Sequence, residues 1–161
     1  MNVIPEAAYR TVEKHLRQRG KLVRKAKEAV ARARARATDT SAPSGSGGGR
    51  GKGGSQSSRV ERGAINVVRA EKRLEKALRW ERLFQKMDEI YPPGETNEGY
   101  VASMIYGNGM SQADLARFSG CSRQTVKLRQ DRYVIRAAFL AAQMGLIKED
   151  ILTDGDTDQK G

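Results

Sequence analysis

The sequence predicts an all-α fold, and two observations carry that prediction. Apolar side chains recur every three or four residues, as at Tyr9, Val12 and Leu16, which is the spacing of one face of an α-helix. No stretch alternates apolar and polar residues in the manner of a β-strand. We therefore expect an N-terminal helical arm, a long middle helix and a C-terminal pair of short-linked helices.

The N-terminal 37 residues are predicted to be helical and strongly basic. Pro5 suits the first position of a helix, and an acidic residue follows it in the first turn. The apolar stripe pauses near Gly20 and resumes at Leu22, Ala26, Ala29 and Val30. The Ala-Arg repeat of residues 31–37 combines good helix formers with positive charge on every side. Residues 1–37 are accordingly treated as one N-terminal basic helical region.

Residues 38–58 are predicted to form a flexible linker. They are rich in Gly and Ser, with one Pro and no large apolar residue. Such a segment buries too little apolar surface to offset the entropy lost on ordering. The linker should separate the basic arm from a helical domain covering residues 59–147.

The helical domain should open with a long helix over residues 59–91. Its apolar positions form two stripes, Val60, Ala64, Val67, Leu74 and Leu78, then Trp80, Phe84, Met87 and Tyr91. Strict heptads do not persist, so a zipper-type dimer is not indicated. Pro92-Pro93-Gly94 ends the helix, a short helix over residues 97–106 follows, and residues 148–161 should form an acidic disordered tail.

Residues 111–137 have the spacing of a helix-turn-helix. Ser111 is a good N-cap for a first helix whose inner side should carry Leu115, Ala116 and Phe118. Gly120 suits the left-handed backbone of the turn. Ser122 should cap the second helix, with Val126 packing on Ala116. The second helix of such a motif can enter the major groove of DNA.

Charge supports a polyanionic partner. The net charge is +11, of which residues 1–60 carry +10 and residues 61–110 carry none, while residues 111–136 carry +4. Neutralising phosphates releases counterions, so basic regions of this kind favour nucleic acid. A generic solubilising excess is the alternative, but arginine, which suits phosphate geometry, predominates over lysine.

Several other classes of function are disfavoured. A single cysteine, Cys121, permits no intrachain disulfide and should be a small buried apolar residue. No apolar run is long enough to span a membrane and no secretory signal is apparent, so a cytoplasmic location in a bacterial host is expected. Near-matches to a P-loop around Lys52 and to a calcium loop at Asp154 both lack required residues. His15 is the only histidine, so we expect no bound metal, no cofactor and no enzymatic activity.

With these elements placed, the C-terminal third resembles region 4 of bacterial sigma factors, and the chain resembles phage late-gene transcription regulators of the ArpU/RinA type. The resemblance rests on Ile4-Pro5 with Tyr9, Val12, Glu13 and Leu16, on the Ser/Gly-rich spacer 44–48, on Ile90-Tyr91, and on Met144-Gly145-Leu146-Ile147. The Ala-Arg repeat departs from this pattern. Arg129 also departs, since sigma-like motifs place an apolar residue there, and Leu128 is the alternative inward residue.

The outward face of the second motif helix should read DNA. Arg123 and Lys127 can pair with guanine, and Gln124 with adenine. Thr125, Arg129, Arg132 and Gln112 are better placed for phosphates, which fix register without encoding sequence. The predicted DNA-binding residues are thus Gln112, Ser122, Arg123, Gln124, Thr125, Lys127, Arg129 and Arg132.

These observations favour a sequence-specific, phage- or prophage-encoded transcription regulator that binds double-stranded DNA at promoters and contacts host RNA polymerase. Homo-oligomers are compatible with the helical arm. Two alternatives remain. A DNA-packaging adaptor of the small-terminase kind would form a stable ring of subunits, and a nonspecific nucleic-acid-binding structural protein would show little sequence preference.

Overall fold

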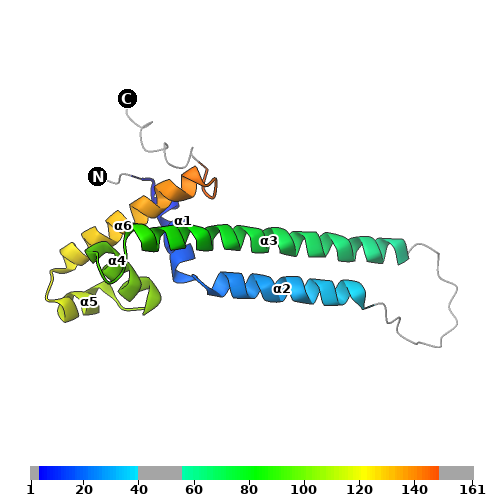
Figure 1. Ribbon diagram of the computed structural model, residues 1–161, viewed down its shortest axis with the longest axis horizontal. Helices are drawn as coiled ribbons and strands as arrows, with labels where there is room; N and C mark the ends of the chain where they lie inside the picture. Colours follow the sequence, from blue (N-terminus) through cyan, green and yellow to red (C-terminus); the bar gives the residue numbers. More distant parts are fainter. Residues whose placement is uncertain (1–3, 40–55, 149–161) are drawn as a thin grey trace, which may run out of the picture. The chain divides into compact units, whose positions relative to one another are not determined.

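The structure is a computed structural model that describes residues 4–39 and 56–148 (Figure 1). Within these ranges every regular element is helical, which confirms the predicted all-α fold. The chain divides into two compact units, one of residues 1–19 with 79–161 and the other of residues 20–78. Most of the predicted linker and almost all of the predicted tail lie outside the described residues, although Thr38 and residues 56–58 are helical.

The first unit contains one N-terminal helix and the C-terminal half of the chain. It consists of α1 (Glu6–Arg17), the end of α3 (Gln56–Ile90), α4 (Asn97–Ala102), the π-helical turn η1 (Ser103–Gly107), α5 (Gln112–Ser119) and α6 (Arg123–Gln143). The segment 97–106, predicted as one helix, is therefore α4 continued by a π-turn. The predicted helix of residues 59–91 is confirmed and begins three residues earlier.

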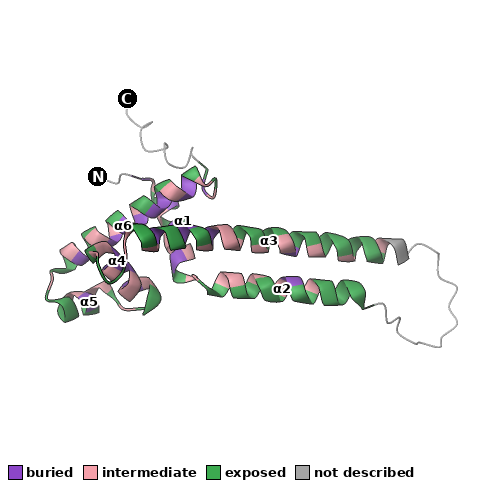
Figure 2. Ribbon diagram, in the orientation of Figure 1, coloured by how far each residue is buried: buried purple, intermediate pink, exposed green. Residues whose placement is uncertain are grey.

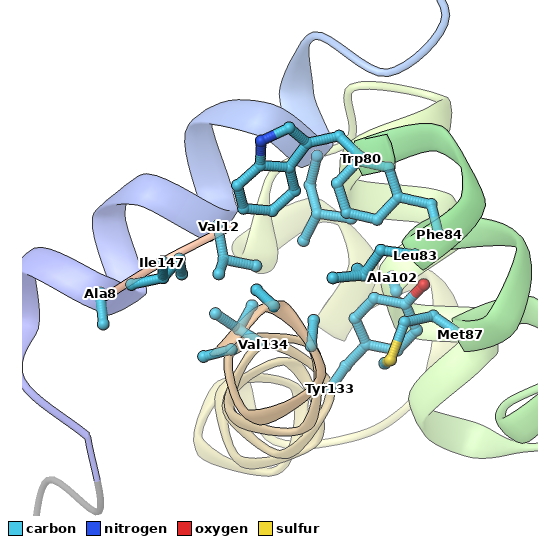
Figure 3. Packing of buried hydrophobic residues seen from close by; sticks show 14 of the residues in the cluster. Ala8, Val12, Trp80, Leu83, Phe84, Met87, Ala102, Tyr133, Val134 and Ile147 are labelled. Carbon is cyan, nitrogen blue, oxygen red and sulfur yellow. The ribbon is translucent and has the colours of Figure 1, made fainter. Parts of the chain in front are cut away.

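The main core of this unit is built from helices that are distant in sequence (Figure 3). Val12 from α1 and Val134 from α6 are fully buried, together with Leu83, Phe84 and Met87 from α3. The stripe at residues 80, 84 and 87 is therefore core, as its spacing predicts, while Tyr91 is half-buried at its edge. The run of alanines on α6 lets neighbouring helices approach closely: Ala137, Ala138 and Ala141 are buried in this cluster.

Polar and aromatic contacts fix the end of α1 against α3. The guanidinium of Arg19 donates to both carboxylate oxygens of Asp88, at 3.2 and 2.7 Å, and lies 5.6 Å from the centre of the Phe84 ring. Although burial alone lowers the pKa of Arg19, the Asp88 carboxylate raises it overall. His15 stacks on Trp80 with ring centres 3.9 Å apart. The arginine therefore remains charged where α1 ends.

The second unit is a helical hairpin of α2 (Lys21–Thr38) and the first half of α3. Small residues line the seam between the two helices: a Cβ added to Gly63 would lie 3.5 Å from that of Ala37. Val30 and Ala70 are the buried apolar residues of this unit. Arg34 forms an ion pair with Glu71 at 2.7 Å, which joins the helices on one side of the seam. The remaining surface of both helices is largely exposed (Figure 2).

Candidate nucleic-acid interface

The segment that carries the predicted DNA-binding residues is α5, a turn, and the start of α6. Ser111 Oγ accepts from the Asp114 amide at 3.1 Å, and Ser122 Oγ accepts from the Thr125 amide at 3.0 Å. Both predicted N-caps are therefore present. Between the helices Gly120 has φ +66°, the left-handed backbone that the turn requires. Local sequence signals thus account for where each helix begins and ends.

A second, smaller core holds α5 against α6. It consists of Val101 and Ile105 with Leu115 and Val126, and Ala116 packs against it. Leu115 and Val126 are 0% and 1% exposed, so the first turn of α6 has a fixed inner side. Cys121 is half-buried at the edge of this core rather than fully buried. Val126 and Ala116 thus belong to the same packed region, as the predicted packing of the two helices requires.

The outer side of the same turn is polar and accessible. Arg123, Gln124 and Lys127 are exposed, and Thr125 is half-buried behind its capping contact. Lys127 Nζ lies 2.7 Å from Asp131 Oδ2, one turn further along α6. These side chains are exposed while Val126 beside them is buried, so the first turn presents Arg123 and Gln124 to solvent without disturbing the core.

Two predicted inward residues were assigned wrongly. Phe118 is 71% exposed and lies outside the small core, to which α5 contributes Leu115 and Ala116 instead. Leu128 is 51% exposed and does not replace Arg129 as an inward residue. Arg129 is half-buried, with Nη1 3.8 Å from Cys121 Sγ, and the residue that faces inward beside it is Gln130.

The predicted phosphate-binding residues fall into different environments. Arg132 is exposed and reaches Glu98 at 3.5 Å, a weak surface pair that an incoming phosphate can displace. Gln112 is half-buried, and its amide donates to Gln130 Oε1 at 2.6 Å. The structure therefore places Gln112 in an internal contact, while Arg132 keeps its guanidinium at the surface.

Sequence periodicity did not identify Gln130, the buried polar residue at the centre of this region. Gln130 is 3% exposed; it accepts from Gln112 and donates to Tyr106 Oη at 2.7 Å and to Glu13 at 3.4 Å. Burial raises the pKa of Tyr106, so its hydroxyl stays protonated. The contacts link α6 to α5, to η1 and to α1. A polar residue at an inward helical position was the only sequence signal for it.

The N-terminal helix also contacts α6 directly. Tyr9 Oη donates to Asp131 Oδ1 at 2.7 Å, while the other carboxylate oxygen accepts from Lys127. Burial, and then this hydrogen bond, raise the pKa of Tyr9 well above its usual value. A groove of about 550 Å³ opens beside the contact, between α1 and α6. Asp131 therefore connects α1 to the exposed face that carries Lys127.

No group of three potential metal-binding side chains occurs among the residues that the structure describes. In the same part of the chain, no helix combines the length and the apolar character needed to cross a membrane. Comparisons with models of protein families, with curated proteins and with solved structures gave no match. The interface must therefore be interpreted from its own residues.

Proposed function

We propose that the protein is a sequence-specific DNA-binding transcription regulator in which α5, the turn at Gly120 and α6 act as a helix-turn-helix. One observation carries the proposal: Arg123, Gln124 and Lys127 are exposed at the start of α6 while Val126, between them, is buried. Arginine and glutamine at the start of a recognition helix can form paired hydrogen bonds with guanine and adenine in the major groove. The likeness to phage late-gene regulators makes a promoter, with host RNA polymerase, the site of action proposed here.

The remaining contacts suit this arrangement. Lys127 is engaged in an ion pair with Asp131, whereas Arg123 is exposed at the start of the helix. Arg132, three turns from the cap, can reach a phosphate once its 3.5 Å contact with Glu98 is given up. Base contacts would therefore come from the first turn, and a backbone contact from further along the helix.

The test begins with selection of binding sites from random double-stranded DNA. Arg123→Ala should weaken binding to the selected site by ~1–3 kcal/mol and relax the preference at one base position. Arg132→Ala should weaken all sequences alike and lower the salt slope by about one unit. Arg136→Ala, which removes another exposed arginine of α6, is the matched control and should change neither the preference nor the slope appreciably.

The outcomes separate the proposal from its rivals. A selection that enriches no sequence, or an Arg123→Ala variant with unchanged preference, would refute sequence-specific recognition by α6. Genome-wide recovery of bound DNA adds a second readout. Peaks at promoters support regulation, peaks at a packaging site with ring-shaped oligomers favour a packaging adaptor, and flat coverage favours a nonspecific structural protein.

A further inference from the structure

We propose that the α2–α3 hairpin is a second DNA-binding surface, which holds the phosphate backbone of duplex DNA without regard to sequence. This inference rests on the proposed function in one respect only, namely that the ligand is duplex DNA. Residues 20–78 contain 15 of the 30 basic residues of the chain but only 5 of the 19 acidic residues, a net charge of +10 against +1 for the other unit. Of these, 13 basic residues and all 5 acidic residues lie in the described ranges 20–39 and 56–78, so most of the charge excess belongs to the hairpin.

The charge is not spread evenly around the hairpin. On α2, positions 25, 32 and 36 share one side of the helix, and on α3, positions 59, 62, 69 and 73 share the side that carries Asn66. All seven of these positions are lysine or arginine, and all are exposed. The three acidic residues of this part of α3, Glu61, Glu71 and Glu75, lie toward other sides of the helix. We call the seven positions with Asn66 the basic face.

A groove marks where the two halves of the basic face meet. It has a volume of about 400 Å³ and is lined by Ala29, Arg32, Ala33, Arg36, Gly63 and Asn66. Its floor is made of the small residues of the seam, and its sides carry two guanidinium groups and an amide. Small floor residues allow a close approach, and guanidinium and amide groups donate the hydrogen bonds that phosphate oxygens accept. The Arg34–Glu71 ion pair, by contrast, involves positions that line no part of this groove.

Nucleic acid fits this surface better than an acidic protein does. Protein interfaces generally have an apolar centre, whereas nucleic-acid interfaces are polar and strongly positive. Of the exposed large apolar residues of the hairpin, Val60 and Val68 share the side of α3 that carries Glu71, and Ile65 is a single side chain that does not line the groove. The 18 residues of α2 extend for about 27 Å, most of one turn of duplex DNA at roughly 34 Å. Several phosphates along one groove edge can therefore meet the basic face together.

The test compares two triple variants of the full chain on random-sequence duplex DNA. Arg32→Gln with Arg36→Gln and Arg62→Gln removes three charges from the basic face. Arg24→Gln with Lys27→Gln and Lys72→Gln removes three charges from exposed positions elsewhere on the same helices, and so is the matched control. Glutamine keeps a helix propensity close to that of either residue, and circular dichroism should confirm that both variants stay helical.

If each lost arginine held one phosphate, the basic-face variant should lose ~2.7 units of salt slope. Raising salt fourfold, from roughly 50 to 200 mM, should then weaken the parent by about 40-fold more than this variant. The control triple should change the slope by less than about one unit. Equal losses in both triples, or no loss in either, would overturn the proposal.

Two further arms distinguish other partners. Tighter binding to single-stranded RNA than to duplex DNA, reduced by the same basic-face variant, would overturn the assignment to duplex DNA. The same assignment would be overturned if the basic-face variant kept the parent's salt slope on DNA but lost binding to purified bacterial RNA polymerase. Repeating the series in an Arg123→Ala background keeps this test separate from the proposed function. The difference in salt slope between the two triple variants is measured on random-sequence DNA, so it should persist even if α6 proves to have no sequence preference.

Discussion

Gln130 offers the sharpest test of how the start of α6 is held in place. Replacement by leucine keeps a similar volume but removes the acceptor for Gln112, at 2.6 Å, and the donor to Tyr106, at 2.7 Å. A buried polar group that loses its partner costs about 1–3 kcal/mol. Gln112 and Tyr106 are both half-buried, and the Tyr106 hydroxyl also donates to Glu13 at 3.4 Å, so the loss should lie near the middle of this range.

We therefore expect Gln130→Leu to lower the free energy of unfolding by about 2 kcal/mol. For a domain the size of the first unit, that loss corresponds to a fall in Tm of about 8–16 °C. Thermal unfolding followed by circular dichroism measures it. Gln85→Leu, which places the same change on an exposed position of α3, is the matched control and should stay within about 0.5 kcal/mol of the parent.

A double-mutant cycle isolates the network itself. Gln112→Ala and Gln130→Leu should show a coupling energy of at least about 0.5 kcal/mol, because the two side chains share a hydrogen bond. A Gln130→Leu protein as stable as the parent would refute the reasoning. It would mean that leucine burial compensates for the lost hydrogen bonds and that the network does not position α6.

Two further predictions concern the first unit. Gly99→Ala should destabilise it by about 1–3 kcal/mol in chemical denaturation, because the added Cβ would overlap the Tyr91 carbonyl, whereas Gly94→Ala, with open space around it, should not destabilise. Burial raises the pKa values of Tyr9, Tyr106 and Tyr133, so protonation of these hydroxyls favours the folded state, and the stability it provides is complete below about pH 10 and lost as pH rises further. In a variant that carries Tyr91→Phe and Tyr100→Phe, so that these three are the tyrosines left, tyrosinate absorbance should therefore appear together with unfolding in an alkaline titration; ionisation near pH ~10 with the helices intact would contradict this.

Much of the fold could be predicted because its signals are local. Ser111 and Ser122 cap their helices, Gly120 takes the left-handed turn, and the stripe from Trp80 to Met87 is buried. Each of these depends on a few consecutive residues and the 3.6-residue period of the helix. The positions of Phe118 and Gln130 were missed for the opposite reason. A short amphipathic helix has an inner side about 100° wide, and which residues at its edges are covered depends on neighbours from elsewhere in the chain.

The amino-acid sequence alone determined which segments are helical and that the chain carries an excess of positive charge. It also determined that Arg123 and Gln124 follow the N-cap of a helix. Tertiary structure decided which helices share a core. The predicted N-terminal region contains two helices that belong to different units: α1 packs against α6 through Val12 and Val134, 122 residues apart, and α2 pairs with α3. It also placed two arginines of α2 and Asn66 of α3 around one groove. The physical reason is that the hydrophobic effect is non-directional. An apolar stripe predicts that its helix will be covered on that side, but the packing of the whole chain decides which element covers it.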